Sequence, residues 1–157
     1  MSRENTWPRG SGGTISLGEL EDTAQEIVPR LWMGGRYAAR LVQWNFDVVV
    51  NLTYYGRSVS DQYSGLYLEW PIEDGEDPPD LAVLSPLVDF LQELHYSGKT
   101  VLIHCQAGLN RSGLVMALVL RSKGWTADGA IAQIRAERDE YCLCNADFEA
   151  YVRGWTP

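Results

Sequence analysis

The stretch VLIHCQAGLNRSG, residues 101–113, places a cysteine directly after a short apolar run and an arginine six positions later. The apolar run is short enough to be a buried β-strand, and the apolar stretch 113–122 has the composition of a buried helix. Cys105 is therefore expected at the carboxyl end of a strand, and Arg111 at the start of a helix. In open α/β sheets, ligands bind at this edge of the sheet.

The loop between this strand and this helix has the composition of an anion-binding site. A loop of this length can point successive backbone N–H groups into one concavity, and the start of the helix adds partial positive charge. Arg111 offers a planar guanidinium that can bind two oxygens of a phosphate, and these charges favour the thiolate form of Cys105. Gly108 allows tight curvature, and Ser112 can donate a hydrogen bond to the sulfur when it leaves as a thiolate. We predict that phosphate binds to Gln106, Ala107, Gly108, Leu109, Asn110 and Arg111.

Outside this loop, the pattern of apolar residues predicts strands that alternate with helices. Strands are expected within 26–35, 46–52, 65–72 and 99–104, and helices within 36–45, 113–122, 127–140 and 146–154. Thr126 and Asn145 are the expected N-caps of the last two helices. This alternation predicts an α/β fold, a single-domain three-layer sandwich with a central, mostly parallel sheet flanked by helices.

Pro86 interrupts one further helical pattern. The apolar residues of 81–94 keep helical spacing, but a proline in the interior would break a continuous helix. The pattern favours Ser85 as N-cap and Pro86 as the first helical residue, with 80–84 as a separate turn. The alternative is a single kinked helix.

Composition limits the classes of function. The net charge of −8 disfavours nucleic acid and acidic membranes as partners. No apolar run approaches the roughly 20 residues that span a bilayer, and the N-terminus lacks the apolar segment of a secretory signal. Three cysteines fit neither a disulfide framework nor a zinc site. We expect a cytoplasmic monomer without a metal, with a flexible leader at 1–24 and the catalytic domain at 25–157.

The segment HCQAGLNRSG, residues 104–113, resembles the phosphate-binding signature of cysteine-dependent protein phosphatases, and its short form resembles their dual-specificity subgroup. The resemblance extends from about residue 26 to about residue 154. It implies that Cys105 attacks phosphorus and forms a cysteinyl phosphate, which water then hydrolyses without a metal or other cofactor. It also implies that His104 orients the loop through hydrogen bonds.

This chemistry requires an acid for the departing oxygen and later a base for water. The segment WPIEDGEDPPDL, residues 70–81, resembles the general-acid loop of the same subgroup. By that resemblance Asp74 is the acid, and Asp77 is the alternative.

The substrate expected from these features is a phosphorylated protein that carries phosphotyrosine and also phosphoserine or phosphothreonine. Phosphotyrosine ranks first if the pocket is deep, whereas the absence of a long phosphotyrosine-recognition segment favours a shallow site. The loop interior carries no basic residue besides Arg111, which disfavours the phosphoinositides that related enzymes hydrolyse. The GLNR segment also resembles the loop of RNA 5'-triphosphatases, but the acidic chain offers little to bind a polyanion. A noncatalytic module that binds phosphorylated residues is the alternative outside enzymes.

Three residues near the C-terminus leave alternatives open. Alternation in YCLCN predicts that one of Cys142 and Cys144 points inward as packing, and the alternative is a redox disulfide with Cys105. Asn145 is expected to cap the last helix, and the alternative is that it reaches the active site.

Overall fold

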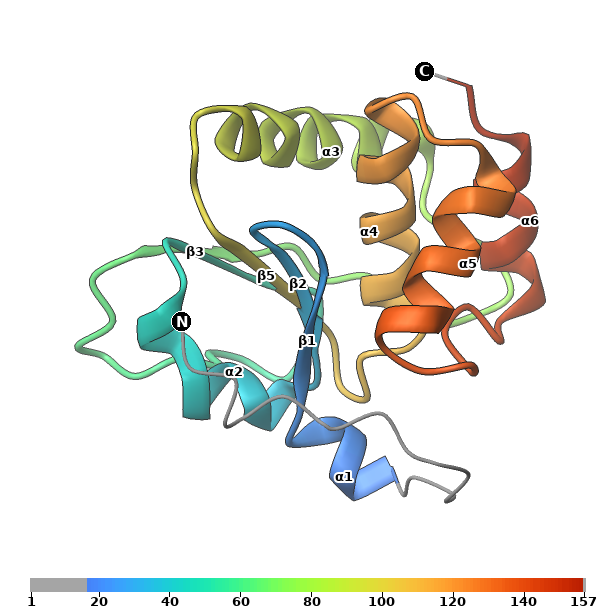
Figure 1. The fold of residues 1–157 in the computed structure, drawn as a ribbon. Helices are drawn as coiled ribbons and strands as arrows, with labels where there is room; N and C mark the ends of the chain where they lie inside the picture. The colour runs from blue at the N-terminus through green and yellow to red at the C-terminus, as the bar shows by residue number, and fades with distance from the viewer. Residues whose placement is uncertain (1–16, 157) are drawn as a thin grey trace.

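A mixed five-stranded sheet lies at the centre of the protein (Figure 1). The computed structural model describes residues 17–156. The strands, in spatial order, are β1 (Ala24–Val28), β2 (Leu31–Gly34), β5 (Val101–His104), β3 (Val48–Asn51) and β4 (Leu66–Glu69). β1 is antiparallel to β2, and the other neighbouring strands are parallel. The prediction of a mostly parallel sheet is thus confirmed, with one antiparallel strand at its edge.

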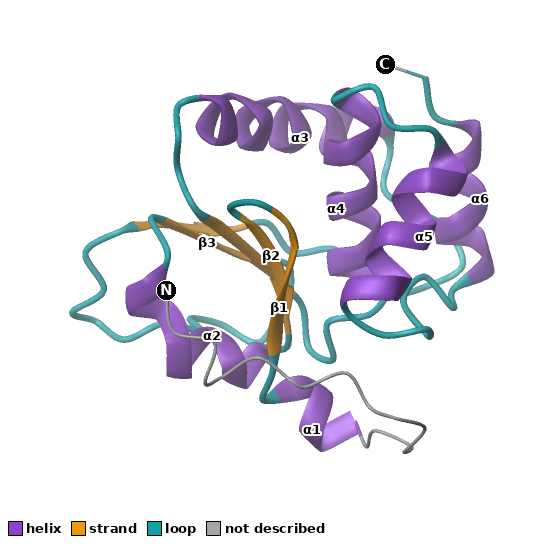
Figure 2. Cartoon of the chain, viewed as in Figure 1, coloured by secondary structure: helices purple, strands orange, loops and turns teal. Residues whose placement is uncertain are grey.

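Helices lie on both sides of this sheet (Figure 2). On one side lies α2 (Arg36–Val42), continued by a short 3-10 helix, η1 (Gln43–Asn45). The other side carries α3 (Leu81–Tyr96), α4 (Arg111–Ser122), α5 (Ala127–Glu137) and α6 (Ala146–Gly154). A short helix, α1 (Leu17–Glu21), precedes β1. These layers form the predicted sandwich, and Thr126 and Asn145 cap α5 and α6 as predicted.

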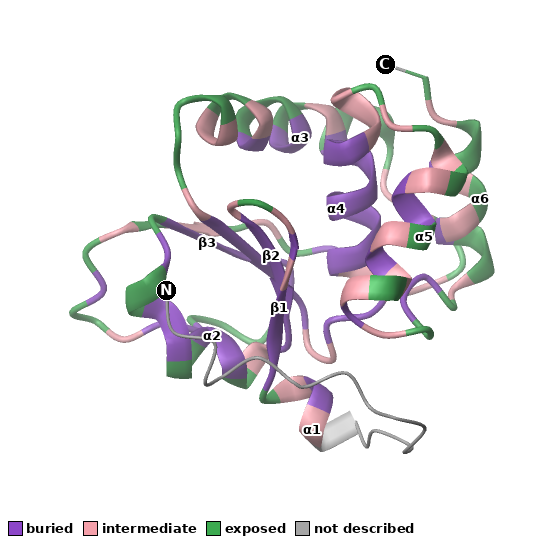
Figure 3. Ribbon diagram, viewed as in Figure 1, coloured by how far each residue is buried: buried purple, intermediate pink, exposed green. Residues whose placement is uncertain are grey.

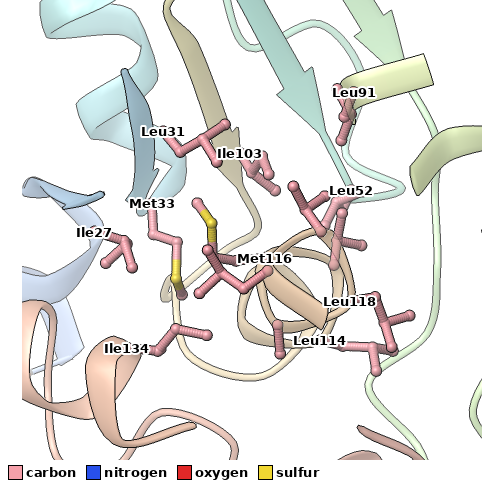
Figure 4. Close-up of a cluster of buried hydrophobic side chains, with 14 of the residues drawn as sticks. Ile27, Leu31, Met33, Leu52, Leu91, Ile103, Leu114, Met116, Leu118 and Ile134 are labelled. Carbon is pink, nitrogen blue, oxygen red and sulfur yellow. The ribbon is translucent and has the colours of Figure 1, made fainter. Parts of the chain in front are cut away.

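Helix α4 lies at the centre of the larger of two apolar cores. Its residues 112–120 are all buried, as the colours of Figure 3 show. Figure 4 shows its side chains among those of the sheet and of α5, including Met33, Ile103 and Ile134. The smaller core lies against α2 on the opposite face, where Leu102 packs. Because successive residues of β5 enter different cores, the strand is a continuous apolar run.

Helix α3 differs from the favoured prediction. It runs without interruption from Leu81 to Tyr96 with Asp80 as its N-cap, so Ser85 as N-cap is wrong and the single-helix alternative is the one observed. The N–H group that Pro86 lacks would have bonded the carbonyl group of Ala82. Both residues are exposed on the outer side of the helix, where water can bind the freed carbonyl oxygen.

The described part of the expected leader, residues 17–24, packs against the domain. Leu20 belongs to the larger core and is 3% exposed, and helix α1 and the start of β1 also precede residue 25. The short polar segment around Leu20 contains too few apolar residues for its packing to be predicted from the sequence. Residues 1–16 of the expected leader lie outside the described residues.

The predicted strand at 26–35 is a hairpin rather than a single strand. A turn at Pro29 and Arg30, with Arg30 at a φ of 70°, separates β1 from β2. The parallel register then aligns four strand ends at one edge of the sheet, where His104 lies between Gly34 and Asn51. The loops that leave this edge build the candidate site.

Candidate active site

The loop of residues 105–111, called here the Cys105 loop, connects β5 to α4 at the carboxyl edge of the sheet. Cys105 is 2% exposed, and its Sγ lies 3.3 Å from the Oγ of Ser112 in the first turn of α4. Cys105 therefore follows a strand and Arg111 begins a helix, as the sequence predicts. Ser112 lies where a hydroxyl can donate a hydrogen bond to the sulfur.

Five consecutive carbonyl oxygens of this loop, from Cys105 to Leu109, accept hydrogen bonds from groups outside it. The donors, in order, are His104 Nδ1 (3.1 Å), Arg36 N (3.0 Å), Arg138 Nη2 (2.9 Å), Arg138 Nε (3.1 Å) and Leu143 N (3.2 Å). In a planar trans peptide group the N–H points opposite to the carbonyl. The N–H groups of residues 106–110 are therefore directed to the other side of the loop, and together they form an anion-binding concavity.

Gly108 is the residue at which this curvature demands glycine. Its φ is 76°, in the left-handed region that side chains disfavour. A Cβ there would lie 2.6 Å from the carbonyl oxygen of Gly34 and 2.5 Å from Nη2 of Arg138. Both the backbone conformation and the close packing therefore require glycine at position 108, as the sequence predicts.

The N-terminus of α4 faces the same concavity. Asn110 occupies the N-cap position, but its side chain makes no capping hydrogen bond to the helix. Uncapped N–H groups and the helix dipole favour an anion here. Arg111 is half-buried, its Nη1 lies 3.5 Å from the carbonyl oxygen of Ile72, and its buried Nε has no hydrogen-bond partner among residues 17–156. A bound oxyanion would satisfy that donor.

His104 is fully buried behind the loop as a neutral imidazole. Its Nδ1 donates to the carbonyl oxygen of Cys105, so its Nε2 is left to accept from the Oγ of Ser58 at 2.7 Å. Burial, with a smaller contribution from the charges of Arg36 and Arg111, lowers the pKa of His104 to about 4. At neutral pH this side chain is not an imidazolium, and its single N–H holds the loop through the hydrogen bond to Cys105.

Asp74 is held at the rim of the loop by two asparagine side chains. Asn110 Nδ2 donates to its Oδ2 at 3.1 Å, and Asn145 Nδ2 donates to its Oδ1 at 2.8 Å and to the carbonyl oxygen of Gly75 at 2.9 Å. The Oδ1 of Asn145 meanwhile caps α6 by accepting from Asp147 N and Phe148 N. Both predicted roles of Asn145 are therefore present in one side chain.

The two carboxylates proposed as the acid are placed differently. Both carboxylates are exposed, but Asp74 is tied to the Cys105 loop through Asn110, whereas Asp77 lies further along the same segment. Position alone therefore favours Asp74 over Asp77 as a proton donor to a substrate in the loop.

Sequence reasoning missed two groups of this site. Arg138 at the end of α5 donates to two carbonyl oxygens of the loop, and Ser58 orients His104. A basic residue at a helix C-terminus is ordinarily explained by the helix dipole, and a serine in a loop by solvent. Their partners are distant in sequence, so no local pattern identifies them.

The three cysteines are free thiols. Cys142 is buried and Cys144 is exposed, which confirms the predicted alternation. Burial raises the pKa of Cys142 to about 12, so its thiol is neutral at physiological pH. The alternative of a redox disulfide with Cys105 stays a prediction.

Within 17–156 no group of three His, Cys, Asp or Glu side chains is placed to hold a metal ion. No helix in the same range is long and apolar enough to cross a membrane.

Several known proteins resemble this chain. Residues 31–156 match the catalytic domain of the dual specificity phosphatases. The 123R protein of Invertebrate iridescent virus 6, which bears a tyrosine phosphatase name, is 30% identical over 116 residues, covering 72% of this chain and 78% of the viral one. Dual specificity protein phosphatase 5 of Homo sapiens is 27% identical over 117 residues, covering 72% of this chain but 30% of that protein.

Solved structures show the same architecture. The crystal structure of human DUSP28 superposes with a TM-score of 0.70 at 21% identity, covering 83% of this chain and 90% of that one. At this identity the likeness concerns the fold alone. The sequence match, which spans most of the chain and includes the whole Cys105 loop, shows that this protein belongs to the family of dual specificity phosphatase catalytic domains.

Proposed function

We propose that this chain is a phosphoprotein phosphatase that hydrolyses phosphotyrosine, and also phosphoserine and phosphothreonine, through a cysteinyl-phosphate intermediate. The observation that carries the proposal is the Cys105 loop, whose five outward carbonyl oxygens direct the intervening N–H groups toward one anion. Arg111 supplies a guanidinium at the same place, with a buried Nε that an oxyanion can satisfy. Hydrogen bonds to developing charge of this kind are a major source of catalysis.

In the first step, the Cys105 thiolate attacks phosphorus, an S–P bond forms and the P–O bond to the substrate breaks. The departing oxygen takes a proton from the Asp74 carboxyl group, which leaves Asp74 ionised. Loop N–H groups and Arg111 bind the equatorial oxygens of the phosphoryl group. The two asparagine contacts of Asp74 hold its carboxyl group at the rim, and each oxygen keeps a second lone pair for a proton.

In the second step, the Asp74 carboxylate accepts a proton from water as the water oxygen attacks phosphorus. The S–P bond breaks and the electron pair returns to Cys105 as a thiolate. Ser112, whose Oγ lies 3.3 Å from the sulfur, donates a hydrogen bond to that thiolate. Inorganic phosphate leaves, and the enzyme returns to its starting protonation state.

The proposed substrate class follows from the surroundings of the loop. Its interior side chains include no basic group besides Arg111, which fits a single phosphate better than an inositol polyphosphate. Tyr54 and Tyr55 are exposed on a loop that Arg36 ties down beside Gln106, so aromatic surface lies close to the site. This placement supports phosphotyrosine as the first choice. A cytoplasmic location and a monomeric state stay predictions from the sequence.

The decisive experiment compares wild type with C105S on a phosphotyrosine peptide. We expect turnover by the wild type, no turnover by C105S, and retained binding of the phosphopeptide by C105S, because serine is a far weaker nucleophile while the N–H groups and Arg111 remain. Phosphoserine and phosphothreonine peptides, a phosphoinositide and a 5'-triphosphorylated RNA complete the panel. Appreciable turnover by C105S would exclude Cys105 as the required nucleophile, and preferred turnover of the lipid or the RNA would exclude the substrate class.

A further inference from the structure

Arg138 buries a positive charge directly behind the Cys105 loop. The residue is 4% exposed, and its five N–H groups lie within hydrogen-bond distance of six acceptor oxygens, three of which share the two N–H groups of Nη1. Every one of these six acceptors is a neutral oxygen: the carbonyl oxygens of Leu20, Thr23, Ala107 and Gly108, the Thr23 hydroxyl and the Gln25 amide. A buried guanidinium whose hydrogen bonds all go to neutral groups has a large desolvation cost, so a specific role for its charge is expected.

The geometry explains why this residue is an arginine. Nε and Nη2 lie on one edge of the planar guanidinium, and they donate to the neighbouring carbonyl oxygens of Gly108 and Ala107 at 3.1 and 2.9 Å. These bonds fix two successive peptide groups, so the N–H groups of Gly108 and Leu109 point away from Arg138 into the concavity. A lysine has one nitrogen and cannot reproduce this parallel pair together with the other contacts.

The charge of Arg138 lies on the opposite side of the loop from the anion-binding concavity. Burial lowers the pKa of Arg138, whereas the negative charges that Cys142, Cys105 and Asp139 can carry raise it. Cys142 is neutral at physiological pH because its own pKa is about 12. Besides the carboxylate of Asp139, its neighbour in sequence, the anions that this guanidinium faces through the loop are the Cys105 thiolate and any phosphate that the loop binds.

We propose that Arg138 is a positioning residue for the proposed phosphatase reaction, holding the Cys105 loop in its anion-binding form and stabilising the thiolate and the bound phosphate from behind. The other edge of the same guanidinium binds Leu20, Thr23 and Gln25, so the segment 20–25 is part of this support. This role rests on the proposed function, because it presupposes that the loop binds phosphate.

Several other groups surround the Cys105 sulfur and must be held constant in any test of its ionisation. Arg111 and the N-terminus of α4 lie on one side, and the neutral imidazole of His104 lies behind. Further groups on the neighbouring elements are Asp74 at the rim, Cys142 and Asp139 after α5, and Arg36 at the start of α2. Substitutions at Arg138 leave all of these side chains in place.

The test compares R138K and R138M with R121M. Arg121 donates to the carbonyl oxygens of Trp125 and Trp155 at the far end of α4, so R121M removes comparable main-chain contacts away from the loop. The readouts are the thermal midpoint, the affinity for inorganic vanadate, kcat and KM on a phosphotyrosine peptide, and the pH dependence of Cys105 alkylation by iodoacetate.

For R138M we expect vanadate affinity and kcat/KM to fall by about a hundredfold, as for loss of an oxyanion donor, and the alkylation profile to move to higher pH. R138K keeps the charge, so its alkylation profile should stay within a few tenths of a pH unit of wild type while vanadate affinity falls about tenfold. R121M should lower the thermal midpoint only. If Arg138 had a merely structural role, substitutions at Arg138 and at Arg121 would both lower the thermal midpoint, and the pH dependence of Cys105 alkylation would not change.

A folded R138M with vanadate affinity and kcat/KM within about threefold of wild type overturns the proposal, since misplacing the N–H groups of Gly108 and Leu109 should cost at least as much as losing one donor. If neither variant folds, nitrogen NMR of wild type decides: vanadate should shift the Arg138 Nε–H resonance and leave that of Arg121 in place, and an unmoved Arg138 resonance also overturns it. Failure of the proposed function itself gives a different result, because wild type would then neither bind vanadate nor hydrolyse the peptide.

Discussion

The asparagine contacts of Asp74 allow positioning of the acid to be separated from folding by N145D. Asn145 uses Oδ1 to cap α6 and Nδ2 to hold Asp74 and Gly75. Aspartate is as good an N-cap as asparagine, so the cap survives in N145D. The substitution removes both donors and places a second carboxylate beside Asp74, which disfavours the closed position of the acid segment.

The size of the effect follows from the two hydrogen bonds. One goes to a charged oxygen and one to a neutral carbonyl oxygen, at 2.8 and 2.9 Å. Their combined loss costs about 2 kcal/mol, discounted because Asp74 is exposed. This energy corresponds to about a thirtyfold loss in the population with the acid in place. The free energy of unfolding should fall by no more than about 2 kcal/mol, because the cap of α6 survives and only these two contacts are lost.

The assay measures kcat/KM on phosphate esters whose leaving groups differ in basicity. Esters with poor leaving groups need protonation and should slow by about thirtyfold, whereas esters with good leaving groups should change by less than about threefold. In a D74N background the same change at Asn145 should add less than about threefold. N45D is a matched control, because Asn45 is exposed in η1 and the charge changes equally. Equal slowing of both ester classes, or additive effects in the D74N background, would refute the positioning of Asp74 by Asn145.

Four other substitutions test the remaining parts of the site. R111K should lower kcat/KM by at least about a hundredfold with little change in thermal midpoint, since lysine keeps the charge but loses the two-pronged contact; an effect below about threefold would remove Arg111 from the phosphoryl group. D74N should steepen the dependence on leaving group and flatten the basic limb of the pH profile, whereas D77N should change neither, and the reverse pattern would make Asp77 the acid. Because burial lowers the pKa of His104 to about 4 against 6.5 when unfolded, wild type should be fully stabilised above pH 6.5 and lose up to about 3 kcal/mol between pH 6.5 and 4. Urea unfolding of H104Q should show a flatter dependence on pH in this window, and an unchanged slope would mean that His104 titrates normally.

The fold was predictable wherever the signal was local. The apolar run before Cys105, the arginine that starts α4, and the caps Thr126 and Asn145 are all defined by residues within a few positions of one another. Periodicity and turn chemistry act over that range. The same reasoning failed at Pro86, where only the exposure of the proline and of the carbonyl group it frees allows the helix to continue.

The residues of the Cys105 loop could be predicted from the sequence, whereas the residues of other elements that support the loop could not. A short motif determines that N–H groups, Arg111 and Cys105 share one place, because they are adjacent in sequence. The partners that hold the loop come from other elements: Ser58 lies 46 residues from His104, and Arg138 lies 30 residues from Gly108. Tertiary packing alone brings these groups together, and a sequence taken by itself contains no measure of it.

The support of the Cys105 loop by Arg138 also has a consequence for folding order. Its hydrogen bonds join Gln25 and Leu20 to a residue 113 and 118 positions later. Closing contacts of such separation is slow, because the entropy of the intervening chain is lost before the contact forms. We expect the local strand and helix segments to form first and phosphate binding to arise only in the last kinetic phase of refolding. During synthesis on the ribosome, a chain stopped before residue 138 would contain the whole cysteine motif and still bind no phosphate. Vanadate binding by such a stalled chain would show that the loop assembles without its distant support.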